Sequence, residues 1–237
     1  MKTVIVDRRI GPECEKNLFL HGFMPILLPS SSQMTDAISS HPDSLIFRYK
    51  NEIIASADYC EEALTAFTDL RAYSDVKIHF TDERLGKGFP YDARMNALVM
   101  GERLFCNIKT VSESILKFTR KRGLKICHTN QAYPACSTLT LGEAAAITAD
   151  RGLAEVMQAE GIRVTLIKNG NISLPPYEYG FIGGACGVFG NKVYFFGDYH
   201  THPDAELIEA AIRDEGLVPI SLSSGPLTDF GGMLFFN

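Results

Sequence analysis

Long apolar runs are missing from this sequence of 237 residues, and none approaches the roughly 20 residues that a membrane-spanning helix needs. The chain begins with Met1 and Lys2, which lead directly into the strand-like run from Thr3 to Val6. A signal peptide would instead show an apolar stretch and a cleavage site. We therefore expect a cytoplasmic protein that does not engage membranes.

Paired cysteines are also missing. The six cysteines form no Cys-x-x-Cys pair and fall mostly within apolar segments. This pattern indicates reduced, mainly buried thiols and argues against a disulfide framework or a zinc knuckle. They are Cys14, Cys60, Cys106, Cys127, Cys136 and Cys186.

Positive charge is not in excess. The 23 Lys and Arg residues stand against 28 Asp and Glu residues, for a formal net charge of -5. A surface dedicated to nucleic-acid phosphates would carry the opposite balance. The one basic cluster, from Lys117 to Arg122, lies at the end of an expected helix, where it complements the helix dipole. We therefore expect no nucleic-acid partner. The partners we do expect are a small-molecule ligand and a second copy of this chain, as a homodimer.

A phosphate-binding loop is absent as well. The glycine-rich run from Phe181 to Gly187 is not followed by Lys and Ser or Thr, and it leads into a strand where a P-loop leads into a helix. These glycines are better explained by close backbone approach in a crowded centre. We expect no nucleotide site and no cofactor.

The chain does contain an internal repeat. Residues 133–150 combine Ala-Cys, an apolar strand, a polar turn, a second apolar strand and a closing Asp, and residues 181–198 carry the same signals. Weaker copies flank these two. Hairpin turns near residues 51, 101, 142 and 191 recur at spacings typical of closed or stacked arrays.

Each copy predicts a strand, a strand, a helix and a strand. The first copy lacks its leading strand, which the terminal segment 228–237 can supply beside the strand at residues 3–7. The sequence thus predicts a five-unit α/β propeller of ββαβ repeats, in one domain spanning residues 1–237. Pairing of the N- and C-terminal strands closes it and protects the strand edges. The remaining elements are expected as strands at 23–28, 44–49, 53–55, 76–80, 97–100, 104–106, 124–127, 136–141, 144–148, 162–167, 187–189, 193–196 and 217–222, with helices at 12–21, 58–73, from 112 to 123, from 150 to 161 and from 203 to 216.

This architecture resembles the pentein superfamily, the α/β propeller of the guanidino-modifying enzymes. Within it, five motifs are similar to an uncharacterised bacterial branch: His41-Pro42-Asp43, Asn130 to Thr138, Ile147 to Asp150, Tyr179 to Gly184 and His202-Pro203-Asp204. The resemblance implies a central small-molecule site. It also implies acidic residues that hold a guanidinium by charge-assisted hydrogen bonds, and a His that transfers protons.

The superfamily's enzymes place a cysteine nucleophile near the chain end, commonly after a Gly-Gly motif. The similar motif here runs from Gly231 to Phe235 without a cysteine, and none follows Cys186. Loss of that group removes the usual covalent chemistry. Two hypotheses follow: a hydrolase with a different nucleophile, or a non-catalytic binding protein that has lost it.

Cys136 and Cys186 occupy matching places at the starts of two predicted hairpins, so Cys136 with His202 and Asp204 is the candidate catalytic set. The alternative is that both cysteines are small packing residues. Asp198, His200, His202 and Asp204 alternate as metal ligands would on a strand, but Pro203 is expected to start a helix and break that alternation. We therefore expect no metal.

The remaining candidates are polar residues expected to line the centre and bind the substrate. Each His-Pro-Asp tripeptide can hold its His and Asp at defined angles, although an Asp that caps the backbone would look the same. The substrate-binding candidates are His41, Asp43, Asn107, Asn130, Asp150 and Asp229.

Overall fold

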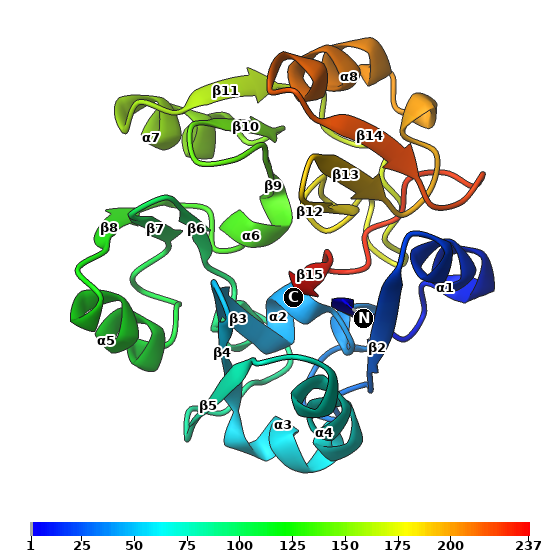
Figure 1. The fold of residues 1–237 in the computed structure, drawn as a ribbon. Coiled ribbons are helices and arrows are strands. Elements are labelled where there is room, and N and C mark those ends of the chain that lie inside the picture. Colours follow the sequence, from blue (N-terminus) through cyan, green and yellow to red (C-terminus); the bar gives the residue numbers. More distant parts are fainter. Residues whose placement is uncertain (1) are drawn as a thin grey trace.

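The computed structural model describes residues 2–237, which form five small three-stranded sheets arranged around a common centre (Figure 1). In every sheet the first strand pairs antiparallel with the second, and the second pairs parallel with the third. A helix connects the second strand to the third and lies on the outside of the ring (Figure 1). The predicted five-unit α/β propeller is confirmed.

The strands in sheet order are β15 (Leu234–Phe236), β1 (Lys2–Asp7) and β2 (Phe23–Leu28); β3 (Ile46–Tyr49), β4 (Glu52–Ser56) and β5 (Lys77–Thr81); β6 (Leu98–Met100), β7 (Arg103–Cys106) and β8 (Lys125–His128); β9 (Thr138–Thr140), β10 (Ala145–Thr148) and β11 (Arg163–Leu166); and β12 (Cys186–Phe189), β13 (Lys192–Phe195) and β14 (Val218–Ser221). The outer helices are α1 (Gly11–Leu20), α3 (Ala57–Glu62), α4 (Leu64–Tyr73), α5 (Glu113–Lys121), α7 (Arg151–Ala159) and α8 (Ala205–Asp214). Shorter helical turns are α2 (Pro42–Leu45), α6 (Pro134–Ser137), η1 (Asp36–Ile38), η2 (Tyr91–Ala93) and η3 (Tyr199–Thr201).

The ring closes as the sequence predicts, because β15 pairs antiparallel with β1 and places Phe236 opposite Thr3. Strands β1 and β15, at the two ends of the described residues 2–237, therefore lie side by side near the centre (Figure 1). Phe235 is almost fully buried, and its ring lies 4.7 Å from that of Phe23 and 5.5 Å from that of Tyr194. Aromatic packing of this kind joins the first and fifth units.

Helix α5 shows how the local sequence fixes an outer element. The Ser112 side chain accepts a hydrogen bond from the Ser114 backbone N–H at 3.1 Å, Ile115 and Leu116 are buried, and Gly123 has a φ of 69° after the last turn. The polar cap, apolar stripe and left-handed stop are the three signals that define a surface helix. Among residues 2–237, no helix is both long and apolar enough to cross a membrane.

Several predicted boundaries are wrong near the centre. Residues 44–45 and 136–137 were predicted to be extended but belong to the helical turns α2 and α6, which begin at Pro42 and Pro134. Pro fixes a φ that suits the first helical turn. The predicted helix at 58–73 is divided at Ala63, and in the terminal segment only Leu234–Phe236 forms a strand.

Candidate functional site

A cavity of about 340 Å³ lies between the inner strands of the five units. Its wall consists of the five inner strands β3, β6, β9, β12 and β15, each of which starts its unit. One end of the cavity lies at the hairpin turns that follow these strands, and we call it the outer end. The opposite end lies where the chain enters the strands, and we call it the inner end. One residue from each inner strand illustrates the wall: Arg48, Val99, Thr140, Val188 and Leu234.

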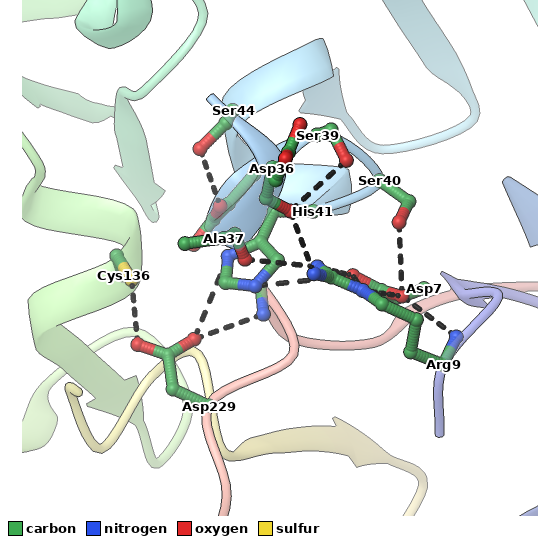
Figure 2. A network of polar contacts seen from close by, with 12 residues as sticks. Asp7, Arg9, Asp36, Ala37, Ser39, Ser40, His41, Ser44, Cys136 and Asp229 are labelled. Carbon is green, nitrogen blue, oxygen red and sulfur yellow. Dashed lines mark hydrogen bonds and ion pairs between the residues drawn. The ribbon is translucent and has the colours of Figure 1, made fainter. Parts of the chain in front are cut away.

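A buried polar cluster surrounds Asp43, which is the residue of the cluster that belongs to the cavity wall. The Cys136 thiol donates a hydrogen bond to Asp229 Oδ2 at 3.3 Å, and His41 Nδ1 lies 3.7 Å from Asp229 Oδ1 (Figure 2). Asp43 lies on the same turn as His41 and contributes to the wall of the cavity. These four residues come from segments up to 188 positions apart in the sequence, and all are at most 8% exposed. We call them the inner cluster: His41, Asp43, Cys136 and Asp229.

The carboxylate of Asp229 is held by the backbone as well as by the thiol. The backbone N–H of Phe181 donates to Oδ2 at 2.8 Å, and that of Gly231 donates to Oδ1 at 2.9 Å. A Cβ added at Gly184 would lie 1.9 Å from Asp229 Oδ1. The glycine-rich segment therefore permits a close backbone approach at a crowded centre, as predicted.

The other side of His41 faces Asp7, whose Oδ2 lies 3.8 Å from His41 Nε2. Asp7 is fully buried and accepts hydrogen bonds from the Arg9 guanidinium, at 2.9 Å from Nε, and from Ser40 at 3.0 Å (Figure 2). Both carboxylate distances to His41 exceed hydrogen-bonding range. The histidine therefore lies between two carboxylates, and Arg9 links this chain of groups to the protein surface.

Asp43 has an unusual environment for a carboxylate. Burial raises its pKa to about 6, although the nearby His41 opposes that increase. Its Oδ1 accepts a hydrogen bond from Ser44 at 3.1 Å, whereas its Oδ2 has no hydrogen-bond partner among residues 2–237. A buried carboxylate oxygen without a donor is costly unless a ligand supplies one.

The Cys136 thiol is not prepared for ionisation in this arrangement. Burial raises its pKa well above the ordinary value, and the carboxylates of Asp229 and Asp43 raise it further. The sulfur is therefore a neutral thiol at neutral pH. A positive charge next to these carboxylates would oppose their effect and favour the thiolate.

Cys186 does not match Cys136 in position. Cys186 is the first residue of β12, whereas Cys136 lies in α6, two residues before β9, so the predicted equivalence is wrong by two positions. The Cys186 thiol donates to the Ile182 backbone carbonyl at 3.0 Å, and burial raises its pKa. It is a packing residue with a satisfied thiol.

The structure does not bring His202 and Asp204 to Cys136. They lie between η3 and α8, where His202 Nδ1 accepts from the Asp204 backbone N–H at 3.1 Å. Asp204 Oδ2 accepts from the Lys168 backbone N–H at 2.6 Å, which is the main reason that its pKa is low. His202 is almost fully buried, and burial lowers its pKa. The histidine of the inner cluster is therefore His41, in the other His-Pro-Asp tripeptide.

Asn107, Asn130 and Asp150 form a separate group outside the central cavity. The Asn107 amide donates to the Asn130 carbonyl at 3.1 Å, and Gln131 Nε2 donates to Asp150 Oδ2 at 2.7 Å. Asp150 also caps α7, because its Oδ1 accepts from the Leu153 backbone N–H at 2.8 Å. Of the six predicted substrate-binding residues, the structure thus brings His41, Asp43 and Asp229 together.

A substitution at Asp150 tests this capping role. We expect Asp150→Ala to lower the free energy of unfolding by about 1 kcal/mol and Asp150→Asn to lower it by only a few tenths, because Asn also caps helices. Urea unfolding of both variants measures the difference. An Asn variant as unstable as the Ala variant would contradict the assignment.

Sequence reasoning missed Asp7, Arg9 and Ser40, the residues behind His41. One signal for Asp7 was available: it ends a buried, β-branched strand, as Asp150 follows β10 in the fourth unit. Nothing local marked Ser40, whose bond to Asp7 spans 33 residues.

Comparison with solved structures identifies the class of fold. The amidinotransferase SxtG from Microseira wollei has a TM-score of 0.60 and 12% identity, with 100% of this chain and 94% of that chain covered. The dimethylarginine dimethylaminohydrolase of Pseudomonas aeruginosa has a TM-score of 0.60 and 11% identity, with 99% of each chain covered. An agmatine deiminase of C. jejuni has a TM-score of 0.57 and 7% identity, with 94% and 87% covered.

All three are guanidino-modifying enzymes of the pentein superfamily. Their structural similarity shows that the five units of this chain form a pentein fold. Within this class, residues 5–234 match the family of unknown function DUF6873, and the chain belongs to that family. None of the curated proteins compared with the chain is significantly similar to it.

Proposed function

We propose that this protein binds a small guanidino compound, or a related cation, at the inner end of the central cavity. The observation that carries the proposal is Asp43, a buried carboxylate in the cavity wall whose Oδ2 lacks a hydrogen-bond donor. A guanidinium supplies both the missing donors and the missing positive charge, in the planar geometry that carboxylates prefer. The pentein fold supports this ligand class, because the structural neighbours act on guanidino compounds.

Hydrolysis of the bound compound is the first candidate for an activity. The Cys136 sulfur is the nucleophile available in the inner cluster, and it contacts the carboxylate that could take its proton. The sulfur would attack the guanidinium carbon, and an amine or ammonia would leave with the electrons of the broken C–N bond and that proton. Water would then displace the sulfur, giving a urea and the free thiol. His41 is the candidate for proton transfer.

Binding without catalysis is the second candidate. It is favoured by the two carboxylates that keep the thiol protonated and by the absence of a cysteine after Gly231 and Gly232. In that case the inner cluster recognises a cation and performs no covalent step. Both candidates need the same ligand at Asp43.

The test separates binding from turnover. The protein is titrated with arginine, agmatine and methylarginines in a calorimeter, and the same mixtures are assayed for ammonia, amine or urea. In parallel, mass spectrometry follows alkylation of Cys136 in the free, ligand-bound and denatured protein.

Binding with product release, and with Cys136 alkylated faster than in the denatured chain, is the expected result for a hydrolase. Binding without product, with slow alkylation of Cys136, would leave the non-catalytic alternative. If none of these compounds binds at millimolar concentration, the proposal is wrong.

A further inference from the structure

A second cavity, of about 190 Å³, lies in the fourth unit, and its wall shares no residue with that of the central cavity. It includes residues that follow the neighbouring parallel strands β10 and β11 (Figure 1). The segment 167–182, which connects the fourth and fifth units, contributes most of the remaining wall. Ligands of α/β folds commonly bind beyond the carboxyl ends of parallel strands. We call this the lateral cavity, and six residues of its wall carry its chemistry: Ser137, Asp150, Ile167, Lys168, Ile172 and Ile182.

Two oppositely charged side chains follow these strands. Asp150 comes two residues after β10, and Lys168 comes two residues after β11. Thr148 pairs with Leu166 at the ends of the two strands, so residues 150 and 168 lie at the same edge of the sheet. Neighbouring strands are about 4.8 Å apart. A carboxylate and an ammonium group therefore belong to one cavity wall, at the spacing of adjacent strands.

Both charged groups have partners in the protein and can still bind a ligand. The Asp150 carboxylate accepts one hydrogen bond at each oxygen, from the Leu153 backbone N–H at 2.8 Å and from Gln131 Nε2 at 2.7 Å. An ionised carboxylate has about four acceptor positions. Lys168 Nζ lies 3.2 Å from Asp204 Oδ1, and an ammonium group has three donors. The wall therefore offers acceptors for a ligand ammonium and donors for a ligand carboxylate.

The Ser137 hydroxyl is a second, independent indication of a ligand. Ser137 is 2% exposed and belongs to the wall, yet its Oγ has no hydrogen-bond partner among residues 2–237. Buried hydroxyl groups in folded proteins nearly always have one. The buried side chains of Ile167, Ile172 and Ile182 supply an apolar surface in the same wall. A matching ligand thus has polar groups at one end and an apolar group at the other.

We propose that the lateral cavity binds a small zwitterionic α-amino acid with an apolar side chain. Asp150 binds the ammonium group, Lys168 binds the carboxylate, and the Ser137 hydroxyl donates a hydrogen bond to that carboxylate. The three isoleucines contact the apolar side chain. An α-amino acid carries its two opposite charges on one carbon atom, which suits opposite charges on adjacent strands. This site is separate from the central cavity, so it does not depend on the proposed function.

The experiment compares three probes in calorimetric titrations of the whole chain: leucine, isopentylamine and 4-methylpentanoate. Isopentylamine is leucine without the carboxylate, and 4-methylpentanoate is leucine without the ammonium group. We expect leucine to bind about 10- to 100-fold more tightly than either, because each lost charge removes a charge-assisted hydrogen bond. None of the probes contains a guanidinium, so the titrations do not report on the proposed ligand of Asp43.

Three variants test the wall residues separately. Asp150→Asn keeps the cap of α7 and should reduce the advantage of leucine over 4-methylpentanoate to less than about threefold, while its advantage over isopentylamine remains. Lys168→Met should have the reverse effect. Ser137→Ala should weaken leucine binding about fivefold without lowering the free energy of unfolding, because the hydroxyl has no partner within the protein. Lys117→Met, an exposed lysine of α5 outside the cavity, is the control and should change no affinity.

Three outcomes would overturn the inference. Equal affinity for all three probes, or no leucine binding at millimolar concentration, would refute the zwitterion and leave the proposed function intact. The same loss for every probe in Asp150→Asn and Lys168→Met would make these residues structural. Leucine binding that is lost in Asp43→Asn and kept in Asp150→Asn would place leucine in the central cavity. Leucine binding without any binding of guanidino compounds would instead refute the proposed function alone.

Discussion

An Asp43→Asn variant is expected to lose at least about 100-fold in affinity for a guanidinium ligand and, at the same time, to be more stable than the wild type at pH 8. The loss follows from removing a charge-assisted hydrogen bond in a buried site. The gain follows from the raised pKa of about 6, which indicates that the empty protein holds an unfavourable buried charge. Binding groups held at a cost in stability are common at functional sites.

The pH dependence of the gain has a definite sign. In the unfolded chain Asp43 ionises near 3.8, and in the folded protein near 6. The folded state therefore binds the proton more tightly, and the wild type loses stability as pH rises from 3.8 to 6, then stays constant. A pKa increase from 3.8 to about 6 corresponds to about 3 kcal/mol, which is the largest stabilisation expected for Asp43→Asn.

Urea unfolding at pH 4.5 and pH 8 measures this gain, and Asp69→Asn, at an exposed position, serves as the control. The gain should be small at pH 4.5 and large at pH 8 for Asp43→Asn, and absent for the control. Ligand affinity of the wild type should fall about tenfold per pH unit below 6, because a guanidinium keeps its charge while Asp43 loses its own. A variant that is less stable at pH 8, or that still binds, would contradict the role of Asp43.

The second large effect is expected at Gly183. A Cβ at this position would lie 2.3 Å from the carbonyl oxygen of Ala135, 2.4 Å from that of Thr138 and 2.7 Å from that of Cys136. These are backbone atoms of the turn that carries Cys136 and cannot rotate away. We expect Gly183→Ala to lower the free energy of unfolding by about 3 kcal/mol or more and to disturb the Cys136 environment.

Gly225→Ala is the matched control, because Gly225 is half-buried and a Cβ there meets nothing within 4 Å. Chemical unfolding of the two variants, with the alkylation rate of Cys136 as a local probe, tests the prediction. A Gly183→Ala protein as stable as the control would show that the 135–138 turn is not packed against this glycine.

Much of the fold could be predicted because the signals are local. The cap at Ser112, the apolar stripe of α5 and the stop at Gly123 each depend on residues within a few positions. Because the first unit lacks its leading strand, closure of the ring by the terminal segment 228–237 could also be predicted, and within that segment residues 234–236 pair with β1. Boundaries were missed where a short apolar run has no clear period, as at Cys136: the helical turn that begins at Pro134 extends to Ser137 and takes up the first two residues of the strand predicted at 136–141.

The candidate site could be predicted only in part. The sequence indicated a cysteine at residue 136 and carboxylates at 43 and 229, but the contact between Cys136 and Asp229 spans 93 residues. A local sequence pattern cannot predict a contact between residues that far apart in the chain. The network behind His41, formed by Asp7 and Ser40, likewise depends on how the first and second units meet.

The two His-Pro-Asp tripeptides show most directly where local information ends. Both were candidates, and the sequence by itself determined that each holds a His and an Asp beside a rigid Pro. Tertiary structure decided their surroundings: residues 41–43 lead into the inner strand β3, whereas residues 202–204 lead into the outer helix α8. The sequence determined the repeat, the five units and their closure, because these follow from the periodicity and turn residues of short segments. Which polar residues share the centre depends on the position of each segment in the ring, and that position exists only once the ring has closed.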